Sequence, residues 1–244
     1  MGAKVALVTG ASSGIGFAIA AMLAEEGYDL TAVSRTPEKL ERAAAELAAH
    51  GTEVHPVAAN LAVAEEITRV VAAHRERFGR LDLLVNNAGM GIHGEIDAYE
   101  TKYIDMQLAL NLRSVMLFYR DALDLLRAAG AEHRNAMVVN VSSIAGKRGV
   151  AGLSIYSAAK HGVVGFTEAM NEELSGAGIK SCVLCPGFVD TGLADYSQNP
   201  VPGEEMIRTG DVAESVRSLL RLSPHCVIPE ILMTRPGREA VVSG

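Results

Sequence analysis

A tyrosine and a lysine stand four residues apart in the segment Tyr156-Ser-Ala-Ala-Lys160. Because residues four apart share one face of a helix, the Lys160 ammonium can approach the Tyr156 phenol. A free phenol has a pKa of about 10, and a nearby positive charge lowers the pKa of a tyrosine towards neutrality. Such a tyrosine could exchange protons as a general acid or base. The same spacing arises by chance in many helices, so its meaning depends on the rest of the chain.

A glycine-rich turn is the second group that could do chemistry. It reads Thr9-Gly-Ala-Ser-Ser-Gly-Ile-Gly16 and lies between an apolar run and a helical pattern. Glycines there permit a tight turn and close approach of the backbone to a pyrophosphate. The N-terminus of the following helix adds free N–H groups and a partial positive charge. The alternative is a glycine-rich turn that binds nothing, but the position of this turn between a strand and a helix favours a nucleotide site. The predicted contacts are Gly10, Ser12, Ser13, Gly14, Ile15 and Gly16.

Short apolar runs alternate with longer amphipathic patterns along the chain. Strands are expected at Val5–Thr9, Leu30–Ser34, Glu53–Ala58, Leu81–Asn86, Ala136–Ser142, Lys180–Leu184 and Val227–Met233. Helices are expected at Ile15–Glu26, Pro37–His50, Ala64–Phe78, Glu100–Ala129, Ile155–Ser175 and Asp211–Leu222. This alternation is typical of a parallel sheet covered on both faces. We therefore predict one α/β domain over residues 1–244, a doubly wound three-layer α/β/α fold with a mostly parallel seven-stranded sheet.

Composition narrows the possible partners. The 244 residues are 49% hydrophobic and 21% charged, with a net charge of −7 and no basic run. Nucleic acid and anionic membranes are therefore not expected as partners. Three cysteines make no disulfide framework, so we expect a reducing, cytoplasmic location. Cys182 and Cys185 have metal-ligand spacing, but residues three apart in a strand point to opposite faces, and the histidines are scattered. No metal site is expected.

Further motifs follow the glycine turn in a fixed order. Asn86-Asn-Ala-Gly89 follows the fourth strand, Asn111 lies in the next helix, and Ser143 stands thirteen residues before Tyr156. The segment 186–191 follows the sixth strand. Together with Thr-Gly-x-x-x-Gly-Ile-Gly and Tyr-x-x-x-Lys, these motifs resemble the short-chain dehydrogenase/reductase family over nearly the whole chain. The resemblance implies a Rossmann fold and hydride transfer involving a nicotinamide cofactor.

The resemblance also implies a catalytic role for four residues. Tyr156 would be the general acid in carbonyl reduction and the general base in alcohol oxidation, and Lys160 would stabilise its phenolate and bind the nicotinamide ribose. Ser143 would orient the substrate oxygen, and Asn111 would hold a water in a proton relay. A hydride arriving at a carbonyl makes an alkoxide, which donors already in place must meet. Each residue could instead be structural, but the four together favour catalysis.

The end of the second strand indicates the cofactor. Ser34 stands where an NAD-specific site generally has an acid, and Arg35 follows it. Guanidinium pairs well with a 2′-phosphate, so NADP is predicted and NAD is less favoured. The alternative is that Arg35 is only a surface charge. The other predicted cofactor contacts are Asn60, Leu61, Asn87, Ala88, Gly89, Tyr156, Lys160, Pro186, Gly187, Val189 and Thr191.

We therefore expect an NADP(H)-dependent oxidoreductase that interconverts a carbonyl and a secondary alcohol of a small molecule. An epimerase or dehydratase acting on a nucleotide sugar is one alternative, and a catalytically silent nucleotide-binding regulator is another. Asn60 replaces an aspartate usual in the family, yet its amide can still bind adenine. Residues 192–210 are expected to form a substrate lid. The resemblance implies a homo-oligomer, a dimer or tetramer.

Overall fold

A computed structural model describes residues 3–191 and 201–236 of the chain. Its strands are β1 Val5–Thr9, β2 Asp29–Ser34, β3 Val54–Ala58, β4 Leu83–Asn86, β5 Ala136–Val141, β6 Ile179–Pro186 and β7 Glu230–Met233. They form one sheet in the order β3-β2-β1-β4-β5-β6-β7, and every neighbouring pair is parallel. The predicted seven-stranded α/β fold is confirmed, with strand ends differing from the expected ones by a few residues.

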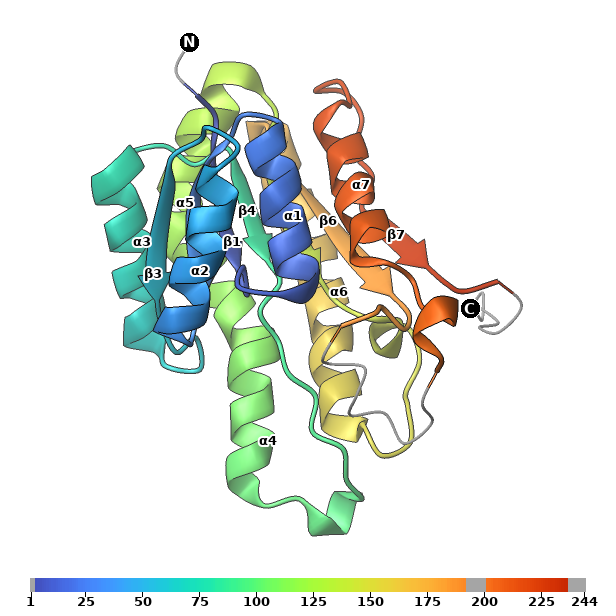
Figure 1. Cartoon of the computed structure of the whole chain (residues 1–244). Helices are drawn as coiled ribbons and strands as arrows, with labels where there is room; N and C mark the ends of the chain where they lie inside the picture. The colour runs from blue at the N-terminus through green and yellow to red at the C-terminus, as the bar shows by residue number, and fades with distance from the viewer. Residues whose placement is uncertain (1–2, 192–200, 237–244) are drawn as a thin grey trace.

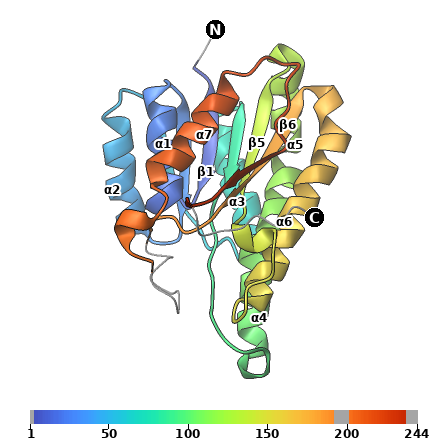
Figure 2. The same cartoon turned by 90° about the vertical axis from the view of Figure 1, so that its right-hand side faces the viewer.

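Helices cover both faces of this sheet (Figures 1 and 2). Their bounds are α1 Gly14–Glu25, α2 Pro37–Ala48, α3 Ala64–Phe78, α4 Thr101–Leu108, α5 Ser114–His133, α6 Ser154–Leu174 and α7 Thr209–Leu220. One core cluster contains residues of α1, α2 and α7, and a second contains residues of α3, α5 and α6. The sheet between them is therefore the middle of three layers.

Alternation along the strands divides the apolar side chains between the two clusters. In β1, Ala6 and Val8 belong to the α1 side, whereas Leu7 belongs to the α5 side. Cys182 and Cys185 in β6 likewise lie in different clusters, and both are buried free thiols. The expected opposite orientation of the two cysteines is confirmed.

The direction of winding changes between β1 and β4. From β1 the sheet runs through β2 to β3 on one side and through β4, β5 and β6 on the other. In an open parallel sheet, ligands bind outside the carboxyl ends of the strands at such a switch point. Figure 1 shows α4 and one end of α6 extending past these strand ends, with the chain after β4 running between them.

One predicted element is wrong in its interior. The helix expected over residues 100–129 is instead α4 and α5, joined by a π-helical turn over Ala109–Arg113. The Ser114 N–H bonds to the Ala109 carbonyl, five residues back, and the Ser114 hydroxyl donates to the Leu110 carbonyl at 2.6 Å. Such turns often mark functional sites. Hydrophobic periodicity did not predict the turn, because one extra residue barely changes the pattern.

Within the described residues, no helix is long and apolar enough to cross a bilayer. The same residues contain no group of three or more histidine, cysteine, aspartate or glutamate side chains placed to hold a metal ion.

Candidate active site

The glycine turn after β1 is formed by backbone geometry that side chains would prevent. Gly10 has φ +69° and Gly14 has φ +58°, in the left-handed region that glycine adopts without strain. A Cβ added at Gly16 would lie 2.3 Å from the Gly10 carbonyl oxygen and 2.3 Å from Nδ2 of Asn87. The first turn of α1 therefore packs tightly against Gly10, which directly follows β1. The N–H groups at the N-terminus of α1 lie at the carboxyl edge of the sheet.

Thr9 joins this turn to the segment after β4. Its Oγ1 donates to the Val85 carbonyl at 3.2 Å and accepts from the N–H groups of Asn87 and Ala88 at 2.9 and 3.0 Å. The Asn87 Nδ2 donates to the Thr9 carbonyl at 2.9 Å. Thr9 fixes the spacing between two predicted cofactor-binding segments. The sequence offered a signal for it, since Thr9 opens the glycine motif, but it was not predicted as a site residue.

The ends of β2 and β3 lie beside the turn. Ser34 pairs in register with Ala58 at the carboxyl end of both strands, and Arg35 follows with an exposed side chain. The Ser34 Oγ is buried without a hydrogen-bond partner among the described residues. Asn60 is exposed, and its Oδ1 accepts from the Ala62 N–H at 3.2 Å. A free hydroxyl next to an exposed guanidinium fits recognition of a phosphorylated ribose.

The segment after β6 closes another side of the site. Gly187 N–H donates to the Met233 carbonyl at 2.8 Å, and Val189 forms a bridge with Ile207. A Cβ added at Gly14 would lie 3.2 Å from the Thr191 Cγ2, so Thr191 meets the glycine turn directly. Of the predicted cofactor contacts in this segment, Thr191 lies against the turn, and Pro186, Gly187 and Val189 connect it to β6.

Tyr156 and Lys160 lie together at the N-terminal end of α6. Both are buried, and the Lys160 Nζ lies 5.6 Å from the centre of the Tyr156 ring. The Nζ donates to the Val141 carbonyl at 2.8 Å, and the Ser142 hydroxyl donates to the Lys160 carbonyl at 2.9 Å. The end of β5 thus holds this lysine by its side chain and its backbone. Ser142 is a second residue that sequence reasoning missed.

The sequence-based expectation for the Tyr156 pKa is wrong in this structure. Burial raises the pKa of Tyr156 to about 12, while a hydrogen bond with the Ser143 side chain lowers it only partly. Burial also lowers the pKa of Lys160 to about 8. The reason is geometric. The Lys160 Nζ lies over the tyrosine ring and donates a hydrogen bond to the Val141 carbonyl. The effect of desolvation on the Tyr156 pKa is therefore larger than the effect of the lysine charge. The Tyr156 phenol is therefore protonated at neutral pH.

Ser143 and Asn111 complete the set. Ser143 follows β5, and its Oγ accepts from the Ala145 N–H at 3.1 Å at the start of a short 3₁₀ helix, Ile144–Gly146. Asn111 lies in the π-helical turn; its Oδ1 accepts from the Met90 N–H at 2.9 Å and its Nδ2 donates to the Met90 carbonyl at 2.8 Å. The Asn111 side chain is thus occupied by the backbone at Met90.

Gly89 connects these groups. A Cβ added there would lie 2.8 Å from the Asn111 Oδ1 and 3.4 Å from the Lys160 Nζ. The predicted catalytic residues Asn111 and Lys160 therefore face the same short segment after β4. Tyr156, Ser143, Lys160 and Asn111 come from three separate elements and meet at the carboxyl edge of the sheet. A buried phenol, a hydroxyl and an ammonium in this arrangement can donate to an oxygen that gains negative charge.

The predicted lid lies partly outside the described residues. Of the range 192–210, residues 192–200 are not described. The remainder contains a short 3₁₀ helix, Gly203–Glu205, and the Ile207 carbonyl accepts from the Asp190 N–H at 2.9 Å. A lid role for the range remains a prediction.

Comparison with known proteins gives the same architecture. A family model described as short chain dehydrogenase matches residues 4–201. A protein of Streptomyces violaceoruber named "Granaticin polyketide synthase putative ketoacyl reductase 1" is 39% identical over 229 residues, 93% of this chain and 83% of that protein. An alcohol dehydrogenase from Thermococcus sibiricus, solved with 5-hydroxy-NADP, superposes with a TM-score of 0.88 at 28% identity, covering 98% of this chain and 99% of that one.

A second solved structure is still more similar in sequence. A variant of actinorhodin polyketide ketoreductase, solved with NADPH, has a TM-score of 0.84 at 34% identity, covering 94% of this chain and 95% of that one. The motif order, the sheet order and the family model agree over most of the chain. This chain belongs to the short-chain dehydrogenase family of oxidoreductases.

Proposed function

We propose that this protein uses NADPH to reduce a carbonyl of a small molecule to a secondary alcohol, and catalyses the reverse oxidation. The observation that carries the proposal is the buried Tyr156 phenol beside Ser143 and Lys160, at the edge of the sheet where the glycine turn begins α1. The solved relatives hold NADPH or a modified NADP, which supports the cofactor assignment.

The residues fit a dinucleotide in three places. Gly10, Gly14 and Gly16 let the turn pack closely against its neighbours, so the N–H groups at the N-terminus of α1 would bind a pyrophosphate. Ser34 and Arg35 would bind the ribose phosphate, and Asn60 and Leu61 would flank the adenine. The segments Asn87–Gly89 and 186–191 would line the nicotinamide half. When bound there, NADPH supplies the hydride.

The protein's part in the reaction is orientation and proton transfer. The Ser143 hydroxyl and the Tyr156 phenol donate to the substrate oxygen, which places the carbonyl carbon for hydride attack. As the oxygen gains charge, Tyr156 gives up its proton, and the Lys160 ammonium stabilises the resulting phenolate. Asn111 holds the Met90 backbone, so it keeps the wall beside the reacting groups in place. A water would then return a proton from the solvent to Tyr156.

The two reaction directions should depend on pH in opposite ways. Reduction requires a protonated Tyr156 and a charged Lys160; the pKa values of about 12 and about 8 mean that both conditions hold below about pH 8. The kcat of reduction should therefore be level through neutral pH and fall as the pH rises beyond that value. Alcohol oxidation requires a phenolate, so its kcat should rise with pH. Steady-state rates in both directions test this, and a reduction rate that climbs with pH would contradict it.

Arg35→Glu should reverse the preference for the cofactor. The exposed guanidinium would be replaced by a carboxylate that repels a 2′-phosphate and accepts hydrogen bonds from a 2′-hydroxyl. We expect the ratio of kcat/KM for NADPH to that for NADH to fall by about 100-fold or more, since a charged hydrogen bond contributes about 1.5–3 kcal/mol and the new repulsion adds to its loss.

Arg42→Glu is the matched control for this change. Arg42 lies in the second turn of α2, and its Nε donates to the Glu38 carbonyl. The same charge reversal there should leave the cofactor ratio within about twofold. An unchanged ratio in the Arg35 variant would show that another group selects the cofactor.

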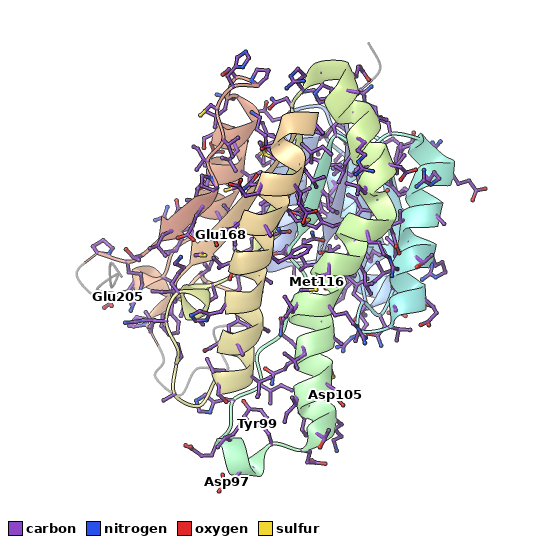
Figure 3. All side chains as sticks on the ribbon, turned by 180° about the vertical axis from the view of Figure 1, so that it is seen from behind. Asp97, Tyr99, Asp105, Met116, Glu168 and Glu205 are labelled. Atoms are coloured by element: carbon purple, nitrogen blue, oxygen red, sulfur yellow. The ribbon has the colours of Figure 1, made fainter. Side chains whose placement is uncertain are left out.

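We further propose that the enzyme works in the cytoplasm as a homo-oligomer, a dimer or tetramer. The support is the family membership together with partly exposed apolar side chains on α4 and α5, Leu108 and Met116. Figure 3 shows Met116 on the outer side of α5. Light scattering coupled to size-exclusion chromatography would measure the assembly, and a monomer at micromolar concentration would contradict the proposal.

A further inference from the structure

The five residues that directly follow the Asn-Asn-Ala-Gly motif, Met90–Gly94, form an anchored segment that we call the 90–94 strip. Asn111 binds both the N–H and the carbonyl of Met90. Gln107, one helical turn earlier and fully buried, accepts from the Ile92 N–H through Oε1 at 3.0 Å. Two buried amides on consecutive helical turns therefore hold every second residue of the strip.

The second half of the strip is held by a tyrosine hydroxyl and by a backbone hydrogen bond. The Tyr99 hydroxyl donates to the Ile92 carbonyl at 2.5 Å, and the Gly94 N–H donates to the Gly152 carbonyl at 2.9 Å. Tyr99 lies near the far end of the molecule, where the chain turns into α4 (Figure 3). Ordering a segment of this length at both ends fixes its side chains relative to the reacting groups.

The intervening residues, Gly91 and His93, are not used in this anchoring. Within the described part of the chain, neither their backbone N–H and carbonyl groups nor the His93 ring nitrogens have a hydrogen-bond partner. The contacts that anchor the strip therefore leave the polar groups of Gly91 and His93 available to a ligand.

The strip lies directly beside Tyr156. A Cβ added at Gly91 would lie 3.8 Å from the Tyr156 Cδ2 and 3.9 Å from the Leu153 Cδ2. Two residues on, the His93 ring occupies the space beside Gly152: a Cβ added there would lie 2.1 Å from its Cε1 and 2.2 Å from its Nε2. Gly152 has φ +73°, so its lack of a side chain both permits the turn and makes room for the imidazole.

We infer that His93 is a specificity-determining residue, whose imidazole donates a hydrogen bond to a second oxygen of the substrate, beyond the carbonyl that is reduced. This inference rests on the proposed function and names its substrate class: keto compounds that carry a second hydrogen-bond-accepting oxygen near the reacting ketone. The other groups near Tyr156 on this wall, Gly91 and Leu153, offer no polar side chain. An imidazole donates whether it is neutral or charged, so the contact does not require a particular pH.

The test compares two substrates and two histidine variants. The substrates are a linear β-keto ester and a methyl ketone of the same chain length, each reduced with NADPH. Selectivity is the ratio of their kcat/KM values. His93→Phe keeps a flat ring but removes both nitrogens, so the ratio should fall by about tenfold, the effect of one hydrogen bond. His93→Gln retains a donor and should recover part of the ratio.

A further variant separates this role from a general disturbance. His225→Phe makes the same replacement at an exposed histidine in the loop after α7, and the ratio should not change. Equal losses for both substrates in His93→Phe, or no loss at all, would overturn the inference. Failure of the wild-type protein to reduce either substrate would instead count against the proposed function and this inference together.

Discussion

Tyr156→Phe is expected to lower kcat for carbonyl reduction by about 100- to 10,000-fold, the usual contribution of a positioned general acid. The variant removes the only proton that the buried ring can give, while the ring itself still packs beside Gly91 and Leu153. NADPH affinity should remain within a few-fold of wild type, because the glycine turn and the end of β2 are untouched. Steady-state rates and fluorescence titration with NADPH measure the two quantities.

Tyr28→Phe is the control for this variant. Tyr28 is also buried, between α1 and β2, but it lies at the opposite end of the sheet. Loss of its hydroxyl should leave turnover near the wild-type value. Near-normal turnover in the Tyr156 variant would remove Tyr156 from the mechanism.

Gly16→Ala is expected to weaken NADPH binding by about 10- to 100-fold. The new Cβ would meet the Gly10 carbonyl oxygen and the Asn87 amide at 2.3 Å, and one of these contacts is backbone. The phosphate-binding turn must therefore move away from α1, at a cost of about 1–3 kcal/mol for overpacking. Titration with NADPH measures the affinity, and thermal unfolding measures the accompanying loss of stability.

Gly165→Ala provides the matched comparison. Gly165 lies in α6, and a Cβ there would meet nothing within 4 Å. This variant should bind NADPH normally and gain up to about 1 kcal/mol of stability, because alanine favours helix. If Gly16→Ala bound NADPH as tightly as Gly165→Ala, the assignment of the turn as the phosphate site would be contradicted.

Much of the fold could be predicted because its signals are local. Apolar runs bounded by turns gave all seven strands, and their alternation with helical patterns gave a parallel sheet. The order of the motifs then placed the glycine turn, Asn86–Gly89, Ser143 and the segment 186–191 at or just after the carboxyl ends of strands. Cys182 and Cys185 show how far simple geometry extends, since strand alternation alone predicted that they would lie in different cores.

The parts that could not be predicted depend on contacts between distant segments. The π-helical turn places Asn111 against Met90, twenty-one residues away, and helix periodicity does not record this contact. The pKa of Tyr156 depends on how much protein covers the phenol and on the direction of the Lys160 side chain. A four-residue spacing established that the two groups are near each other, but it could not establish which effect is larger.

The central claim is that the protein transfers a hydride from NADPH to a carbonyl carbon, while Tyr156 supplies the proton. The most direct measurement uses NADPH deuterated at the transferable position of the nicotinamide, a panel of ketones and keto esters, and mass spectrometry of the products. We expect a secondary alcohol with one deuterium on the carbinol carbon, formed in equal amount to the NADPH consumed and lost in Tyr156→Phe. Tight binding of NADPH with no deuterium in any product would contradict it and would favour a catalytically silent regulator.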